Sequence, residues 1–85
     1  MTVIVPEKVK KILRKMDKSV SSKIISYLDE VSKLENPRSR GKGLTSDKAG
    51  IWRYRVGDYR ILCNIVDEKL IITVIKIDHR SEVYK

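Results

Sequence analysis

Several residue types from which catalytic sites are built are scarce in this chain of 85 residues. Cys63 is the only cysteine, which excludes an intramolecular disulfide, and the apolar segment around it predicts a buried, reduced thiol. His79 is the only histidine, and we find neither a Ser-His-Asp arrangement nor the ligand spacing of a metal site. Gly41-Lys42-Gly43 lacks the spacing of a phosphate-binding loop. None of these familiar motifs therefore indicates a function.

Long apolar runs are also absent. No segment approaches the roughly 20 apolar residues that cross a bilayer, and the N-terminus lacks a basic stretch followed by an apolar run. The sequence therefore predicts a cytoplasmic protein without a membrane partner. Hydrophobic residues make up 41% and charged residues 35%, which favours a folded chain over a disordered one. Without repeats or low-complexity tracts, residues 1–85 are expected to form a single domain.

Basic residues outnumber acidic ones. Nineteen lysines and arginines against eleven aspartates and glutamates give a net charge of +8. Such a charge attracts polyanions and makes their binding sensitive to salt, so nucleic acid is the leading partner class. Many small basic proteins are merely soluble, however, so net charge alone is weak evidence. The placement of the charges has to show whether the protein binds nucleic acid.

The N-terminal half is expected to contain a short strand and two helices. Thr2 to Val5 predict a strand, and Pro6 suits the first position of a helix. Asp17 to Ser19 break this helix and begin the next, which Asn36-Pro37 ends. Two apolar stripes with helical spacing support the assignment: Val9, Ile12, Leu13 and Met16, then Val20, Ile24, Tyr27, Leu28, Val31 and Leu34.

The C-terminal half is expected to be a sheet. Residues 36–50 are polar and read as a loop. Two-residue turns at Gly57-Asp58 and Asp67-Glu68 then separate three strands. The strands are Ile51–Val56, Tyr59–Val66 and Leu70–Ile77. The predicted fold class is α+β, in the order β-α-α-β-β-β, with a short N-terminal strand and a helical hairpin packed on one face of an antiparallel sheet.

Three arginines are expected to share one face of this sheet. A two-residue loop at Gly57-Asp58 places Arg55 opposite Arg60, and alternation puts Arg53 on the same side. Like charges opposite each other destabilise a sheet, so this cluster indicates an anion site, for which the planar guanidinium suits phosphate. The alternative is a spread-out, solvated face. The other face would carry the residues that meet the helices: Trp52, Tyr54, Val56, Tyr59, Ile61 and Cys63.

His79 is expected to project beside the arginines. A two-residue loop at Asp67-Glu68 places Ile75 opposite Arg60, and His79 keeps the same parity. Histidine is the side chain whose unperturbed pKa, about 6.5, suits proton transfer at neutral pH. A surface or capping histidine is the alternative. Tyr84 is a candidate to donate a proton or stack on a base, or else to cover the edge of the core.

Two motifs support a resemblance that covers essentially the whole chain. They are Ile51-Trp-Arg-Tyr-Arg-Val-Gly-Asp-Tyr-Arg-Ile-Leu62 and His79-Arg-Ser-Glu-Val-Tyr84. Together with the order of helices and strands, they resemble the RelE/ParE toxin superfamily, and the RelE-type toxins within it. The resemblance implies a RelE-like fold and a toxin of a type II toxin-antitoxin system.

The resemblance also implies an activity. A RelE-type toxin is a ribosome-dependent endoribonuclease that cleaves mRNA in the ribosomal A site and so inhibits translation. The 2′-hydroxyl attacks the adjacent phosphate and leaves a 2′,3′-cyclic phosphate and a 5′-hydroxyl. This reaction needs a base, cations for the charged phosphorane and an acid for the leaving oxygen, but no metal or other cofactor.

Four catalytic positions follow from the resemblance. Arg53 and Arg55 match a basic pair that lines the site, Arg60 matches the phosphate-binding arginine, and Tyr84 matches a C-terminal tyrosine. Some relatives have lysines in place of Arg53 and Arg55, and arginine is a poor general base because its pKa exceeds about 12.

A second departure concerns the end of the last strand. Some relatives carry a further arginine where this chain has Asp78 or His79. Proton transfer is therefore assigned to His79, with Arg80 as a supporting cation.

The resemblance implies four partners and leaves two other functions open. The partners are a cognate antitoxin protein, the ribosome, mRNA and, only through the toxin-antitoxin complex, operator DNA. One alternative is a ParE-like toxin that inhibits DNA gyrase without nuclease activity. The other is a nucleic-acid-binding or inactive module. The clustered arginines together with His79 and Tyr84 favour the nuclease.

Overall fold

The structure, a computed structural model, describes residues 1–43 and 50–79. Its described elements follow one another as β1 (Thr2–Ile4), α1 (Glu7–Lys15), α2 (Lys18–Lys33), a 3-10 turn (Pro37–Ser39), β2 (Lys42–Gly43), β3 (Ile51–Val56), β4 (Tyr59–Val66), a second 3-10 turn (Asp67–Lys69) and β5 (Ile71–His79). The strands form one sheet in the order β1-β5-β4-β3-β2. The α+β class and the order of helices and strands are confirmed.

The sheet is mixed rather than wholly antiparallel. Strands β3, β4 and β5 form the expected antiparallel meander, and β2 adds an antiparallel strand at one edge. β1 instead pairs with β5 in parallel, with Thr2 opposite Ile71 and Ile4 opposite Thr73. This direction follows from the chain path. In the sequence, the two helices come between β1 and the meander, and they carry the chain across to β2 and β3 at the other edge of the sheet.

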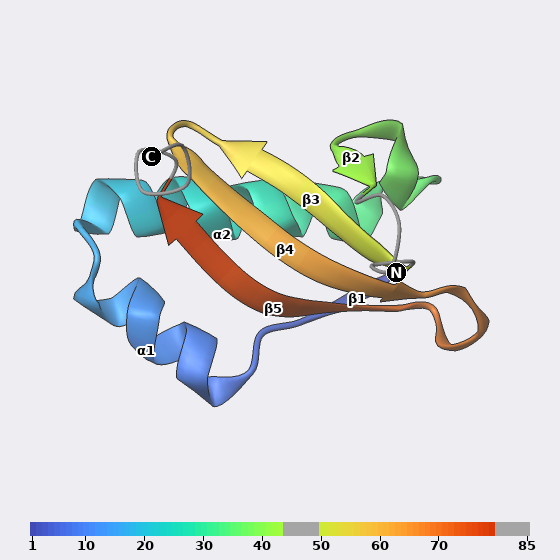
Figure 1. The fold of residues 1–85 in the computed structure, drawn as a ribbon, viewed down its shortest axis with the longest axis horizontal. Helices are drawn as coiled ribbons and strands as arrows, with labels where there is room; N and C mark the ends of the chain where they lie inside the picture. Colours follow the sequence, from blue (N-terminus) through green and yellow to red (C-terminus); the bar gives the residue numbers. More distant parts are fainter. Residues whose placement is uncertain (44–49, 80–85) are drawn as a thin grey trace.

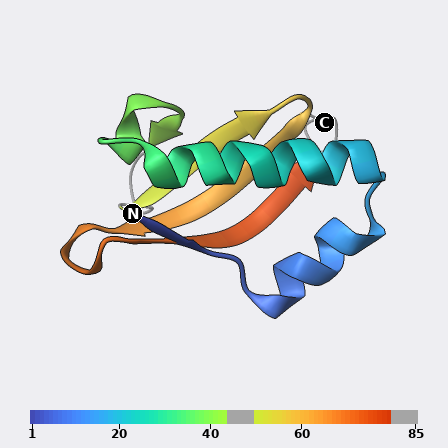
Figure 2. The same cartoon turned by 180° about the vertical axis from the view of Figure 1, so that it is seen from behind.

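Among the described residues, the helices cover one face of the sheet and leave the other open. Figure 1 looks onto that face, and Figure 2 shows α2 lying along the opposite one. α2 contacts both β1 and β3, whereas α1 lies beside β5. Asp17 begins α2 as its cap, because its carboxylate accepts a hydrogen bond from the Ser19 N–H at 3.1 Å. Neither described helix combines the length and apolar character needed to cross a membrane.

The core lies between the helices and the covered face of the sheet. On the helices the predicted stripes supply it, except that Ile12 is 40% exposed. On the sheet, alternate residues point inward as the sequence predicts. The buried residues are Val9, Leu13, Ile24, Leu28, Val31, Tyr54, Ile61, Cys63, Ile65, Ile72, Val74 and Ile77. The arginine face is consequently the one that the helices leave open.

Candidate functional site

The β3–β4 hairpin has the predicted register. Val56 pairs with Tyr59, so Gly57 and Asp58 form a two-residue loop, and Arg55 lies opposite Arg60. Gly57 has a φ of +58°, which glycine adopts readily because it has no Cβ. The side chain of Arg55 bonds back to this loop, with Nε donating to the Gly57 carbonyl oxygen at 3.3 Å.

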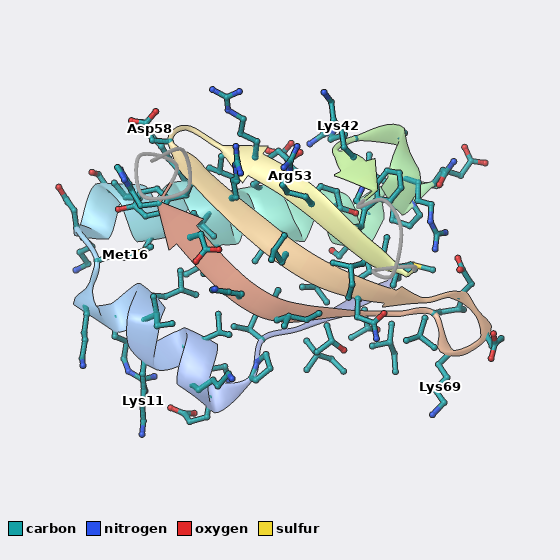
Figure 3. All side chains as sticks on the ribbon, viewed as in Figure 1. Lys11, Met16, Lys42, Arg53, Asp58 and Lys69 are labelled. Atoms are coloured by element: carbon teal, nitrogen blue, oxygen red, sulfur yellow. The ribbon has the colours of Figure 1, made fainter. Side chains whose placement is uncertain are left out.

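Two lysines join the three arginines on the uncovered face. Lys42 on β2 lies opposite Arg53, and Lys76 on β5 lies opposite Leu62 in the same row across the sheet. Figure 3 shows Lys42 and Arg53 rising from neighbouring strands. Directly opposed residues in an antiparallel pair have Cβ atoms about 4.5–5.5 Å apart, so Lys42 and Arg53 are close neighbours, whereas Leu62 lies between Arg53 and Lys76. We call this surface the basic face; its cations are Lys42, Arg53, Arg55, Arg60 and Lys76.

The edge strand that carries Lys42 is held by two aromatic side chains of β3. The Tyr54 hydroxyl donates to the Pro37 carbonyl at 2.7 Å, and Trp52 Nε1 donates to the Arg40 carbonyl at 2.6 Å. Tyr54 is fully buried, and this burial raises its pKa to about 12. Gly41, with a φ of +79°, then lets the chain pass so close to β3 that a Cβ there would lie 2.3 Å from the Arg53 carbonyl oxygen.

The placement predicted for His79 is wrong. The turn between β4 and β5 has four residues instead of two, which alone would preserve parity. A bulge then leaves Ile75 unpaired, since Leu62 lies opposite Lys76 whereas Cys63 lies opposite Val74. One extra residue turns every later side chain of β5 to the other face.

His79 consequently lies opposite Tyr59, on the helix-covered side of the sheet. Their ring centroids are 4.9 Å apart with the planes inclined by 75°, an edge-to-face contact. The bulge that moves His79 away brings Asp78 onto the basic face, opposite Arg60. The geometry that supported proton transfer by His79 is therefore absent.

Two other arginines are engaged with carboxylates. Arg38 makes a bidentate pair with Asp67 at 2.8 and 2.9 Å, and its hydrogen bond lowers the pKa of the Asp67 carboxyl. Arg40 Nη1 lies 2.9 Å from Glu30 Oε1. Arg38 and Arg40 also lie over aromatic rings. These two cations fasten the segment before β2 and are thus occupied in the fold.

The single cysteine is confirmed as a buried thiol. Cys63 is fully buried on the helix-covered side of β4, and burial raises its pKa to about 12. It has no part in the basic face.

Of the six residues predicted for the site, the structure brings together Arg53, Arg55 and Arg60. His79 lies on the other face, and Arg80 and Tyr84 fall outside the described residues. Sequence reasoning missed three others: Lys42, Lys76 and Asp78. Lys42 lies in a segment whose composition indicates a loop, and no local signal marks the bulge that places Lys76 and Asp78.

A comparison with known protein families shows to which family the chain belongs. The family described as "ParE toxin of type II toxin-antitoxin system, parDE" matches residues 3–84. The chain belongs to this family. The expected membership of the RelE/ParE superfamily is confirmed.

Individual proteins similar to this ParE-family chain include a toxin named RelG and solved RelE toxins. Toxin RelG of Mycobacterium tuberculosis is 37% identical over 49 residues, which cover 58% of this chain and 56% of RelG. The match thus spans little more than half of that relative.

Solved structures match over more of the chain. The RelBE2 toxin-antitoxin complex of Mycobacterium tuberculosis contains a chain that is 27% identical and superposes with a TM-score of 0.79, covering 94% of this chain and 91% of its own. The isolated RelE toxin of E. coli is 25% identical with a TM-score of 0.74, covering 98% and 89%. The archaeal RelE-RelB complex of Pyrococcus horikoshii, at 21% identity and a TM-score of 0.77 over 96% and 97%, supports the fold alone. The RelE-like fold is confirmed.

Proposed function

We propose that this toxin is a ribosome-dependent endoribonuclease that cleaves mRNA in the ribosomal A site and thereby stops translation. The observation that carries the proposal is the directly opposed pair Arg55 and Arg60, with Arg53 on the same uncovered face. The likeness to RelG and to solved RelE-type toxins supports it.

The basic face suits the backbone of an RNA strand. Opposed guanidiniums repel each other, and a phosphate between them converts that repulsion into bidentate, charge-assisted hydrogen bonds. Lys42 and Lys76 extend the positive charge along the neighbouring row, which provides for adjacent phosphates. Neither helix covers this face, because α2 lies along the other side of the sheet and α1 lies beside β5.

The same cations suit the transition state of the reaction. When the 2′-oxygen attacks the neighbouring phosphorus, negative charge grows on the nonbridging oxygens. Preorganised arginines stabilise that charge without reorganising, and loss of one such donor in an enzyme costs roughly 10²–10³-fold in rate. We therefore assign transition-state stabilisation to Arg53, Arg55 and Arg60. Arg80 and Tyr84 remain predicted members of the site.

Inhibition of DNA gyrase is the second candidate, because the family that matches the chain is described as ParE toxins. A gyrase inhibitor would use the basic face for binding only. It would leave mRNA intact, so one pair of assays separates the candidates.

The deciding experiment is primer extension on mRNA after brief induction, with and without active translation, beside a gyrase supercoiling assay. We expect cleavage only during translation, and supercoiling unchanged. Blocked supercoiling with intact mRNA would reverse the assignment.

A matched set of variants locates the activity. Arg60→Ala should abolish most cleavage, and Arg53→Ala and Arg55→Ala should weaken it. Lys11→Ala removes the same charge from the exposed side of α1, far from Arg53 (Figure 3), and should cleave like the wild type. Equal activity in all four proteins would show that the basic face is not the working site.

We further propose that the chain acts as a single toxin domain with a cognate antitoxin. One structure that it resembles is the RelBE2 toxin-antitoxin complex of Mycobacterium tuberculosis. A groove of about 610 Å³ between α1 and α2 is the site that fits a partner segment. The groove is lined by Val5, Lys10, Leu13, Arg14, Met16, Lys18, Ser21 and Ile25.

The composition of the groove suggests what it binds. Its floor is apolar, Ile25 is 55% exposed, and three basic residues line it, which together fit an amphipathic segment with acidic side chains. Ile25→Glu should leave the toxin active but prevent its neutralisation when the antitoxin is coexpressed. Full neutralisation of this variant would place the antitoxin elsewhere.

A further inference from the structure

One acidic side chain lies among the cations of the basic face. Across β2 to β5, as far as the structure describes them, Asp78 is the carboxylate that the register places on that side, directly opposite Arg60. Its Oδ1 lies 3.6 Å from Lys76 Nζ, and its side chain is 28% exposed. It is therefore half-buried, beside the groups to which we assign phosphate binding.

The chemistry of the cleavage gives this carboxylate a function. The reaction needs a group that removes the proton from the 2′-hydroxyl, and an arginine holds its own proton too tightly to do so. His79 is turned to the other face by the bulge at Ile75. An ionised carboxylate is an acceptor only, so it can receive that proton.

We propose that Asp78 is a catalytic residue, the general base that deprotonates the 2′-hydroxyl of the nucleotide bound on the basic face. This inference rests on the proposed nuclease function. Arg60, opposite Asp78, then binds a nonbridging oxygen of the phosphate next to that hydroxyl. Base and phosphate ligand thus approach the same nucleotide from adjacent strands.

Every atom in the step is accounted for. Asp78 takes the 2′-hydroxyl proton while the 2′-oxygen forms a bond to phosphorus. The bond from phosphorus to the 5′-oxygen breaks, and that oxygen leaves with the electron pair and takes a proton from water. The hydroxide formed removes the proton from the Asp78 carboxylic acid. Protein and water are regenerated, and nothing is oxidised or reduced.

A purely electrostatic role for Asp78 predicts the opposite effect of its removal on cleavage. If Asp78 served only to offset the repulsion between Arg55 and Arg60, its removal would leave the basic face more positive. RNA binding and cleavage would then be maintained or increased. As a base, Asp78 is needed for the chemical step and not for binding.

The test is single-turnover cleavage of mRNA on programmed ribosomes by Asp78→Asn and Asp78→Glu, with thermal unfolding measured for each. Asparagine keeps the shape but accepts no proton, so Asp78→Asn should lose roughly 10²–10⁴-fold in rate, the range for a general base, while still cosedimenting with ribosomes. Asp78→Glu keeps a base and should lose much less. Asp58→Asn removes an equal charge from the exposed hairpin loop and should cleave like the wild type.

A modified substrate separates base from acid. With sulfur in place of the bridging 5′-oxygen, the leaving group needs no proton. The defect of Asp78→Asn should persist on this substrate if Asp78 is the base, and its disappearance would overturn the proposal.

Other outcomes are equally decisive. If the wild type cleaves mRNA and Asp78→Asn cleaves at the same rate or faster, Asp78 is not the general base. The proposed nuclease function would not be affected. Equal losses in Asp78→Asn and Asp78→Glu would also show that Asp78 is not the base, because a base should be partly retained by glutamate. Absence of cleavage by the wild type would overturn the proposed function itself.

Discussion

Arg55 and Arg60 occupy directly opposed positions on β3 and β4, on the sheet face that neither helix covers. Opposed like charges cost a sheet free energy, which Asp78 opposite Arg60 offsets in part, and the same charges prepare a site for an anion. Stability and function should therefore respond in opposite directions when the pair is broken.

The first prediction concerns that opposition. Arg55→Ala should unfold at a temperature equal to or higher than that of the wild type, and its free energy of unfolding should rise by up to about 1 kcal/mol. Its mRNA cleavage should fall. Added salt should stabilise the wild type more than the variant, because salt screens the repulsion that the variant lacks. Thermal unfolding at low and high salt is the measurement. A clear loss of stability in Arg55→Ala would contradict the prediction.

The second prediction tests the observed position of His79 opposite Tyr59. His79→Phe keeps an aromatic ring against Tyr59 and should retain cleavage, far from the roughly 10²-fold loss expected when a general acid or base is removed. His79→Ala should instead lose about 0.5–1.5 kcal/mol of stability, the usual worth of such a ring pair. Cleavage assays and denaturant unfolding of the two variants suffice. A catalytic defect in a stable His79→Phe protein would support the proton-transfer role that the sequence predicts for His79.

The third prediction compares two glycines with positive φ. Gly57→Ala should cost only the backbone strain of about 1–2 kcal/mol, because an added Cβ meets nothing within 4 Å. Gly41→Ala should cost more, on the order of 3 kcal/mol, because its Cβ would overlap the Arg53 carbonyl oxygen. Chemical denaturation of both variants measures the difference. Equal costs would show that the segment before β2 moves away from β3 without penalty.

The fourth prediction concerns acid. Arg38 lowers the pKa of Asp67 in the folded chain, so their pair stabilises the fold at neutral pH. This contribution should be lost as the pH falls through the lowered pKa, where Asp67 gains a proton. Asp67→Asn should be less stable than the wild type at pH 7, and the difference should shrink in acid. Unfolding measured from pH 7 to pH 3 gives both curves, and a constant difference would argue against the pair.

The fifth prediction concerns the thiol. Because burial raises the pKa of Cys63 to about 12, almost none of it is thiolate at pH 8, and the sulfur is also inaccessible. A disulfide reagent should therefore label the native protein no faster than it unfolds, and label it at once in strong denaturant. Rapid labelling under native conditions would show that β4 opens locally.

Much of the fold could be predicted because its signals are local. The two helices follow from apolar residues at helical spacing, and the hairpin follows from Gly57-Asp58 between two alternating strands. The arginine cluster followed too, since strand parity is set by a two-residue loop. β1 was correctly read as a strand, but its parallel partner β5 lies about 70 residues away along the chain.

The composition, the periodicity and the hairpin loop by themselves determined a basic α+β domain with three arginines on one face. Tertiary structure alone decided which further groups joined them. β2 exists because Trp52, Tyr54 and Gly41 hold the chain against β3, and the bulge at Ile75 exchanges His79 for Asp78 on that face. A bulge changes parity by fitting one strand to its neighbour and to the core beneath, and that fit depends on contacts between distant residues that no local pattern contains.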